Sequence, residues 1–331
     1  MNTIVYLDQN ILSDLRDRRL FETKNEQLLM LKSILMRNDV DVVYSHVTFD
    51  EISQIEKDDF FIEHFAVLEQ LKAKYIEPSS KNIINEKPHK ICLDYLKNLK
   101  ALENTPYSNF AKNIEELSRK LSGLPIDKSL EDIGNIMLNG VDNIINHSIE
   151  QINGLNEDDH EEPMKSLVVI LKNIPQLLKK SLPSSNPFTN TANIPLGTKP
   201  FREQEPIKKF METNPSGANL VAEMKKALNI FNIKASLDDS IENKIMYAYV
   251  LMNWLGYYAD DFDKIKKGKD RFNASQKDMM HVSYAHIASY LISNDEKFRE
   301  KAIVCYELAN IKTVVCTPDR FLEEYFLSKK I

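Results

Sequence analysis

Four carboxylates lie where predicted elements of this sequence begin or end. Asp8 directly follows the apolar run Ile4–Leu7, while Glu51, Asp278 and Asp295 lie at predicted helix starts or in a turn before a helix. Acids from such positions can meet at one edge of a parallel sheet, where they repel one another until a cation arrives. Hard divalent cations prefer oxygen ligands and can activate water for phosphodiester hydrolysis. The pattern therefore favours a metal centre with hydrolytic chemistry.

Helix capping is the alternative explanation for most of these acids. A capping box pairs a Ser or Thr with an acid three residues later at a helix N-terminus. Three pairs have this spacing: Thr48 with Glu51, Ser275 with Asp278, and Ser293 with Glu296. Asp8 is harder to explain in this way, because it ends a buried strand rather than plainly starting a helix.

The elements that must position these acids alternate between strands and helices near both ends of the chain. Apolar runs and periodicity predict the following N-terminal elements: a strand at 3–7, helices at 10–20 and 25–37, a strand at 40–45, one long helix at 49–74 and a short strand in KYIEPSS. The C-terminal elements are helices at 242–262 and 275–290, a strand at 290–293, a helix at 296–310, a strand at 312–316 and a helix at 317–326. This alternation predicts an α/β fold with a parallel sheet.

The middle of the chain has a helical character. Apolar residues recur there at spacings of three and four, and strand-like alternation is hard to find. We therefore predict an α/β domain in two parts, 1–78 and 241–331, that is interrupted by a mostly α-helical insertion at 79–240. Within the insertion, residues 181–206 are rich in Pro, Ser, Thr and Asn and are expected to form a long loop or flap.

Composition excludes several classes of protein. The chain has 331 residues, a formal net charge of −6, three cysteines and eight glycines. The cysteines form no zinc or disulfide pattern, and no glycine motif suits a phosphate loop. No secretory leader or membrane-spanning apolar run is found. We therefore expect a soluble cytoplasmic protein with no membrane partner. The acidic balance argues against a general nucleic-acid coat protein, although it permits a nuclease.

A basic cluster precedes the predicted Asp278 helix. Its residues are Lys264, Lys266, Lys267, Lys269 and Arg271. Such a concentration of donors suits the phosphates of a nucleic-acid substrate. A solvated surface loop explains the same residues equally well.

Three segments resemble PIN-domain nucleases. VYLDQNILSDL resembles the opening of that family, in which the first strand ends in Asp with Asn two residues later. VVYSHVTFDEI resembles the second strand and the helix that brings a glutamate. KDMMHVSYAHIASYLISNDEKF is similar to the family's tail, in which an Asp opens a helix and a Thr/Ser-Asn-Asp turn follows a short strand. The resemblance covers roughly both α/β ends, and the tail is its most specific part.

The resemblance implies a metal-dependent endonuclease. Asp8, Glu51, Asp278 and Asp295 then match the acidic quartet, and Asn10 and Ser293 match the polar residues that support it. Asp8 and Asp278 are expected to bind Mg²⁺ or Mn²⁺, Asp295 to add a direct or water-mediated ligand, and Glu51 to orient the attacking water or a second ion. The implied products carry a 5′-phosphate and a 3′-hydroxyl. RNA is favoured over DNA, and a toxin or antiviral effector is the role that large relatives suggest.

Several features depart from the family pattern. Gln9 and Ser293 replace two common threonines, and the long insertion has no counterpart in a minimal PIN domain. The insertion is a candidate surface for a homo-oligomer or for an inhibitor or regulator protein. His281 lies one turn after Asp278 and can face the site, although such a histidine is more often a satisfied, partly buried residue.

Two other functions remain open. A haloacid-dehalogenase-like phosphatase also begins with a strand that ends in Asp, but it needs a second Asp where this chain has Asn10. A catalytically silent PIN-like scaffold that binds RNA or protein has no need of self-repelling acids.

Overall fold

The structure is a computed structural model. It describes residues 2–55, 58–153, 186, 188–189, 196–203, 205–212, 240–260, 262 and 271–329. The chain divides into two compact units: residues 1–97 with 201–331, and residues 98–200. The first unit therefore joins the two α/β segments from opposite ends of the sequence.

The first unit contains a six-stranded sheet of order β4-β3-β2-β1-β5-β6. Its strands are β1 (Thr3–Leu7), β2 (Val40–Tyr44), β3 (Lys74–Ile76), β4 (Ile83–Ile84), β5 (Tyr290–Ile292) and β6 (Val314–Cys316). All neighbouring pairs are parallel except β3 with β4, so the sheet is mixed rather than wholly parallel. The predicted α/β class is confirmed in this coarser form.

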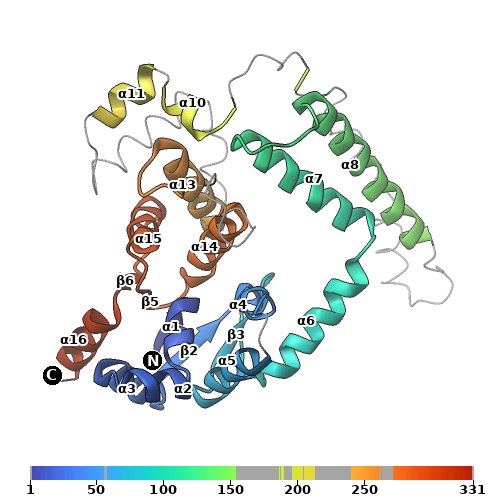
Figure 1. The fold of residues 1–331 in the computed structure, drawn as a ribbon. Coiled ribbons are helices and arrows are strands. Elements are labelled where there is room, and N and C mark those ends of the chain that lie inside the picture. Colours follow the sequence, from blue (N-terminus) through green and yellow to red (C-terminus); the bar gives the residue numbers. More distant parts are fainter. Residues whose placement is uncertain are drawn as a thin grey trace. The chain divides into compact units, whose positions relative to one another are not determined.

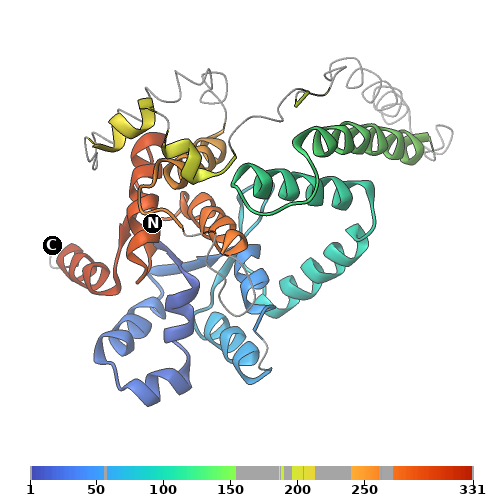
Figure 2. The same ribbon diagram turned by 45° about the horizontal axis from the view of Figure 1, so that its top comes forward.

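Helices cover both faces of the sheet (Figures 1 and 2). One face packs against α1 (Gln9–Asp14), α2 (Asp17–Thr23), α3 (Glu26–Leu35), α5 (Asp58–Gln70) and α16 (Pro318–Ser328). The other packs against α13 (Ile241–Leu255), α14 (Phe272–Ala285) and α15 (Glu296–Ala309). Successive residues of β1 point to opposite faces, so Val5 and Leu7 join the first core and Tyr6 joins the second. Burial on both faces explains why β1 has no charged residue and is rich in large side chains from Ile4 to Leu7.

Two predicted helices are each divided in the structure. The helix expected at 10–20 breaks at Arg16, which has an extended backbone. The Arg16 side chain donates to the Ser13 carbonyl at 2.8 Å and to Glu63 at 2.9 Å, which satisfies the end of α1. The helix expected at 49–74 is instead α4 (His46–Ile52), then α5 and β3. Near the end of α4, Ser53 Oγ donates to the Asp50 carbonyl and competes with continued helical bonding.

The C-terminal elements follow the predicted order, but α13 ends at Leu255 instead of 262, and α14 runs from Phe272 to Ala285 instead of over 275–290. Thr317 caps α16 by accepting a hydrogen bond from the Arg320 amide, and Pro318 occupies the first turn, as predicted. All three cysteines are buried and form no disulfide, which agrees with the absence of a disulfide pattern in the sequence. No helix in the described ranges has the length and apolar character needed to span a bilayer.

The second unit is helical where it is described. It contains α7 (Pro106–Leu121) and α8 (Leu130–Asn153), which pack against each other, and α6 (Pro88–Leu102) and α10 (Thr198–Arg202) cross its boundaries. A further helix, α11 (Glu205–Glu212), belongs to the first unit. Half of the loop predicted at 181–206 lies outside the described residues, and its described part includes α10 and the start of α11.

Candidate functional site

The sheet has a topological switch point at the carboxyl ends of β1 and β5. The strand β1 lies between β2 and β5. From β1 the chain continues to β2 and β3 on one side, and from β5 it continues to β6 on the other side. Asp8 follows β1, and the Ser293–Asp295 turn follows β5. Ligands of open α/β sheets characteristically bind at such a point. Two predicted site segments, nearly 300 residues apart in sequence, therefore lie side by side.

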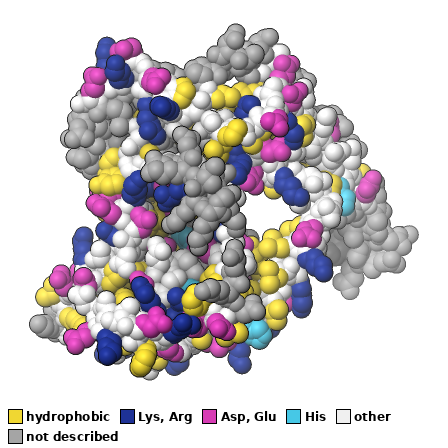
Figure 3. All heavy atoms as spheres, viewed as in Figure 1, with side chains coloured by type: hydrophobic (Ala, Val, Ile, Leu, Met, Phe, Trp, Pro, Cys, Tyr) yellow, Lys and Arg dark blue, Asp and Glu magenta, His cyan; other side chains and the backbone are white. Residues whose placement is uncertain are grey.

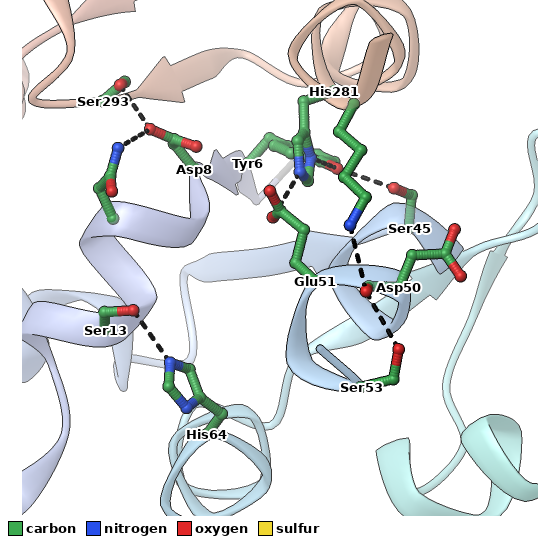
Figure 4. A network of polar contacts seen from close by, with 12 residues as sticks. Tyr6, Asp8, Ser13, Ser45, Asp50, Glu51, Ser53, His64, His281 and Ser293 are labelled. Carbon is green, nitrogen blue, oxygen red and sulfur yellow. Dashed lines mark hydrogen bonds and ion pairs between the residues drawn. The ribbon is translucent and has the colours of Figure 1, made fainter. Parts of the chain in front are cut away.

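Asp8 is held by two polar neighbours. Its side chain is buried, and its Oδ2 accepts hydrogen bonds from Asn10 Nδ2 at 3.1 Å and Ser293 Oγ at 2.7 Å (Figure 4). Ser293 Oγ also accepts a hydrogen bond from the Asp295 amide at 3.0 Å. Asn10 and Ser293, the two predicted supporting residues, thus fix one carboxylate oxygen and tie the ends of β1 and β5 together.

Asp8 and Asp278 are electrostatically strained. Burial raises the pKa of Asp8 above its ordinary value, although His281 and the Ser293 hydrogen bond oppose the shift and Glu51 adds to it. Removal from water, then the charge of Asp8, raises the pKa of Asp278 well above its ordinary value. A cation between two such carboxylates would relieve both effects.

Glu51 enters the site through a chain of polar contacts. His281 Nε2 lies 2.9 Å from Glu51 Oε2, and its Nδ1 lies 2.7 Å from Tyr6 Oη. Tyr6 Oη in turn lies 2.8 Å from Ser45 Oγ. Burial disfavours the charged imidazole, but Tyr6, Glu51 and Asp8 outweigh it and raise the pKa of His281 well above its ordinary value. The histidine therefore holds Glu51 in place from α14, as Figure 4 shows.

Asp295 is engaged in a different way. It is exposed and forms the N-cap of α15, where its Oδ1 accepts a hydrogen bond from the Phe298 amide at 3.0 Å. Burial, then the charges of Asp278 and Asp260, raise the pKa of the Tyr249 hydroxyl well above its ordinary value, and Asp295 adds a smaller contribution. Asp295 thus caps a helix. Asp8, Glu51 and Asp278 instead interact electrostatically with one another or with His281.

The predicted capping boxes are wrong at all three positions. The helix that carries Glu51 begins at His46 after Ser45, so Thr48 lies inside it and is fully buried. The helix that carries Asp278 begins at Phe272, so Ser275 and Asp278 lie in its interior. At α15, the N-cap is Asp295, whereas the spacing predicts a capping box of Ser293 with Glu296. Capping therefore does not explain Glu51 or Asp278.

The sequence interpretation missed three residues beside Asp278. Asp260 raises the pKa of Asp278, and Lys301 opposes that shift. Tyr249 is 1% exposed, and its hydroxyl has no hydrogen-bond partner among the described residues. One signal was available: Lys301 occupies a core position of a helical pattern that includes Phe298, Ala302 and Cys305. A lysine at such a position is rarely buried unless it is paired.

The predicted basic cluster cannot be placed as a whole. Lys264, Lys266, Lys267 and Lys269 lie outside the described residues. Arg271 is half-buried and precedes α14, where its carbonyl accepts a hydrogen bond from the Ser275 amide. A role of this cluster in binding phosphates remains a prediction.

The donor set fits one divalent oxygen-ligated cation. In the described part of the chain, no group of three or more His, Cys, Asp or Glu side chains is arranged to hold a metal. Mg²⁺, however, usually takes only one or two protein carboxylates, with waters and substrate phosphate as its other ligands. Asp8 and Asp278 supply such a pair. The Tyr249 hydroxyl has no hydrogen-bond partner among the described residues, and burial together with Asp278, Asp260 and Asp295 raises its pKa.

Ser293→Ala tests the support of Asp8. The variant removes a donor to Asp8 Oδ2 and an acceptor for the Asp295 amide, so we expect Mn²⁺ to bind about 10-fold more weakly. Ser13→Ala is the matched control, because Ser13 loses a hydrogen bond of 2.9 Å to His64 and touches none of the acids. Calorimetric titration with Mn²⁺ measures both. Equal affinities of the two variants would contradict the supporting role of Ser293.

Tyr249→Phe tests the unpaired hydroxyl. A buried hydroxyl without a partner lowers stability, so its removal should leave the free energy of unfolding unchanged or raise it by about 1 kcal/mol. Tyr306→Phe is the control: its buried hydroxyl donates to the Val282 carbonyl at 2.8 Å, and its loss should cost about 1 kcal/mol. Urea denaturation without metal compares them. A destabilised Tyr249→Phe protein would show that the hydroxyl is satisfied in solution.

Comparisons of the chain with protein-family models, curated proteins and solved structures gave no match. The geometry of the site and the residues of the three PIN-like segments therefore carry the functional assignment.

Proposed function

We propose that the protein is a Mg²⁺- or Mn²⁺-dependent endonuclease of PIN-like type that hydrolyses phosphodiester bonds in RNA. One observation carries the proposal. Asp8 at the end of β1 accepts a hydrogen bond of 2.7 Å from Ser293 after β5, and Glu51 of α4 lies 2.9 Å from His281, which follows Asp278 by one turn of α14. Self-repelling acids have a cost in stability that a metal site explains and a binding scaffold does not.

Each residue of the site has a definite task in this mechanism. Asn10 and Ser293 hold Asp8 by its Oδ2, so that Asp8 and Asp278 together bind the cation. His281 fixes Glu51, which orients the water that attacks the phosphorus in line. A divalent cation bound there supplies a Lewis acid that stabilises charge on the phosphoryl oxygens. Asp295 caps α15, and its water-mediated contribution to the cation remains a prediction.

The surface charge agrees with local rather than general binding of nucleic acid. The face drawn in Figure 3 has basic and acidic side chains interspersed, and the formal net charge is −6. A substrate would thus be held by a small number of donors, for which the 264–271 cluster is the predicted source. The PIN resemblance adds the 5′-phosphate and 3′-hydroxyl products and the toxin or antiviral role. The helical insertion remains the predicted surface for an oligomer or regulator.

A phosphatase of the haloacid-dehalogenase type fits the site less well. That chemistry needs a general acid two residues after the strand-end aspartate. Asn10 occupies this position and donates its amide to Asp8, so it cannot supply a proton there.

Cleavage of labelled polymers tests the proposed function. Purified protein is incubated with single-stranded RNA and DNA in Mn²⁺, Mg²⁺ or EDTA, and the ends of the products are mapped. We expect metal-dependent internal cleavage of RNA that leaves 5′-phosphates and stops in EDTA. Cleavage of DNA alone would show that the substrate is DNA and not RNA. An absence of cleavage together with an absence of metal binding would favour the PIN-like scaffold.

A further inference from the structure

A buried cation lies beside the acidic site. Lys301 of α15 is 0% exposed, and its Nζ lies 2.7 Å from Asp260 Oδ2 and 3.4 Å from Asn253 Oδ1. The same ammonium lies 4.2 Å from the centroid of the Tyr249 ring. A lysine is rarely buried in this way, because its charge must be compensated on every side. Here a carboxylate, an amide oxygen and an aromatic face provide the compensation.

The Lys301 contacts connect directly to the helix that carries Asp278. Asn253 Oδ1 also accepts a hydrogen bond from the Asp260 amide at 3.1 Å, which fixes the segment after α13. Asn253 Nδ2 donates to Ser275 Oγ at 3.1 Å, one turn before Asp278 on α14. Asn253 thus connects the Asp260–Lys301 ion pair to Ser275 in the first turn of α14, three residues before Asp278.

The charges have a consequence for metal binding. The negative charge of Asp260 raises the pKa of Asp278, and the positive charge of Lys301 lowers it. Two neighbouring carboxylates without Lys301 would attract a cation of their own. Lys301 offsets part of the repulsion that Asp260 exerts on Asp278, and its ammonium occupies the position beside Asp260 that a second cation would take.

We propose that Lys301 is a built-in cation that neutralises Asp260 and thereby limits the acidic site to one divalent ion. This inference rests on the proposed function, since it presumes that Asp8 and Asp278 bind a metal. It makes Lys301 a positioning residue that acts through Asp260 and not on the substrate. The inference also means that Asp260 is not a metal ligand, although Asp260 is an acid beside the site.

The number of bound ions tests the inference without using activity. Mn²⁺ binding is measured by calorimetry and by electron paramagnetic resonance for the full-length protein and three variants. We expect one ion for the wild type and two for Lys301→Met, because the freed Asp260 pairs with Asp278. Lys301→Gln removes the charge but keeps a donor to Asp260, so it folds more readily and should also bind two. Asp260→Asn/Lys301→Met removes both charges and should return to one ion.

Two results would overturn the inference. Two ions in the wild type would show that Lys301 does not limit the site, and this result would leave the nuclease function intact. One ion in all four proteins would show that Asp260 does not become a ligand when Lys301 is removed. A wild-type protein that binds no Mn²⁺ and cuts no RNA would instead refute the proposed function, and this inference with it.

Discussion

Replacing Asp8 by asparagine is expected to reduce metal-dependent cleavage at least about 100-fold while the protein stays folded. The asparagine carbonyl oxygen can still accept the hydrogen bonds that Asn10 and Ser293 donate to Asp8 Oδ2. The local structure is therefore preserved, and the change removes only the negative charge that binds the cation. Initial rates on labelled RNA at saturating Mn²⁺ measure the effect.

Asp14→Asn is the matched control for Asp8→Asn. Asp14 lies six residues later at the end of α1, and its Oδ2 accepts a hydrogen bond of 3.4 Å from Asn294. It contacts none of the acids of the site in the described structure, so its variant should keep its rate within about twofold. If the two variants lose the same fraction of activity, Asp8 has no special role in the chemistry.

Replacing Asp278 by asparagine is expected to stabilise the metal-free protein while it abolishes stabilisation by Mn²⁺. The folded-state pKa of Asp278 lies above the ordinary value of 3.8, so the folded protein binds the proton more tightly than the unfolded chain does. Its ionisation therefore lowers stability as the pH rises from about 3.8 through the raised folded-state pKa. At neutral pH, asparagine removes this penalty, and each kcal/mol gained raises the melting temperature by about 2–4 °C.

Thermal melting at pH 7 with EDTA or Mn²⁺ measures both effects. For the wild type, Mn²⁺ at about 100 times its Kd should add about 2.7 kcal/mol to the free energy of unfolding. The Asp278→Asn protein should have a higher melting temperature than the wild type in EDTA, and Mn²⁺ should raise that temperature very little. Asp319→Asn, an exposed acid in the first turn of α16, should follow the wild type in both conditions. A less stable Asp278→Asn protein in EDTA would contradict the assigned strain.

Local sequence signals were sufficient to predict most elements of the first unit. The run Ile4–Leu7 has no charged residue and consists of strand-forming side chains, which favours a buried strand that ends at Asp8. Thr317 and Pro318 similarly define the start of α16. The helix breaks at Arg16 and after Ile52 were not predictable, because they depend on side-chain contacts with Glu63 and with nearby backbone carbonyls.

The polar network around the acids was harder to predict. Tyr6 lies two residues before Asp8, and strand periodicity alone places both on one side of β1. Nothing local, however, pairs Lys301 with Asp260, since 41 residues separate them and the bond depends on how α13 and α15 pack. The capping spacing at Glu51 and Asp278 was misleading for the same reason. Helix starts depend on a few weak interactions, and the structure begins the two helices at His46 and Phe272, three residues before the predicted starts.

Locating Mn²⁺ in crystals by anomalous diffraction at its absorption edge tests the central claim most directly. We predict one strong peak at the carboxyl end of β1, within about 2.3 Å of carboxylate oxygens of Asp8 and Asp278. The peak should be absent from crystals of Asp8→Asn grown under the same conditions. A peak at other residues, or no peak in wild-type crystals at saturating Mn²⁺, would contradict the assignment of these acids as a metal centre.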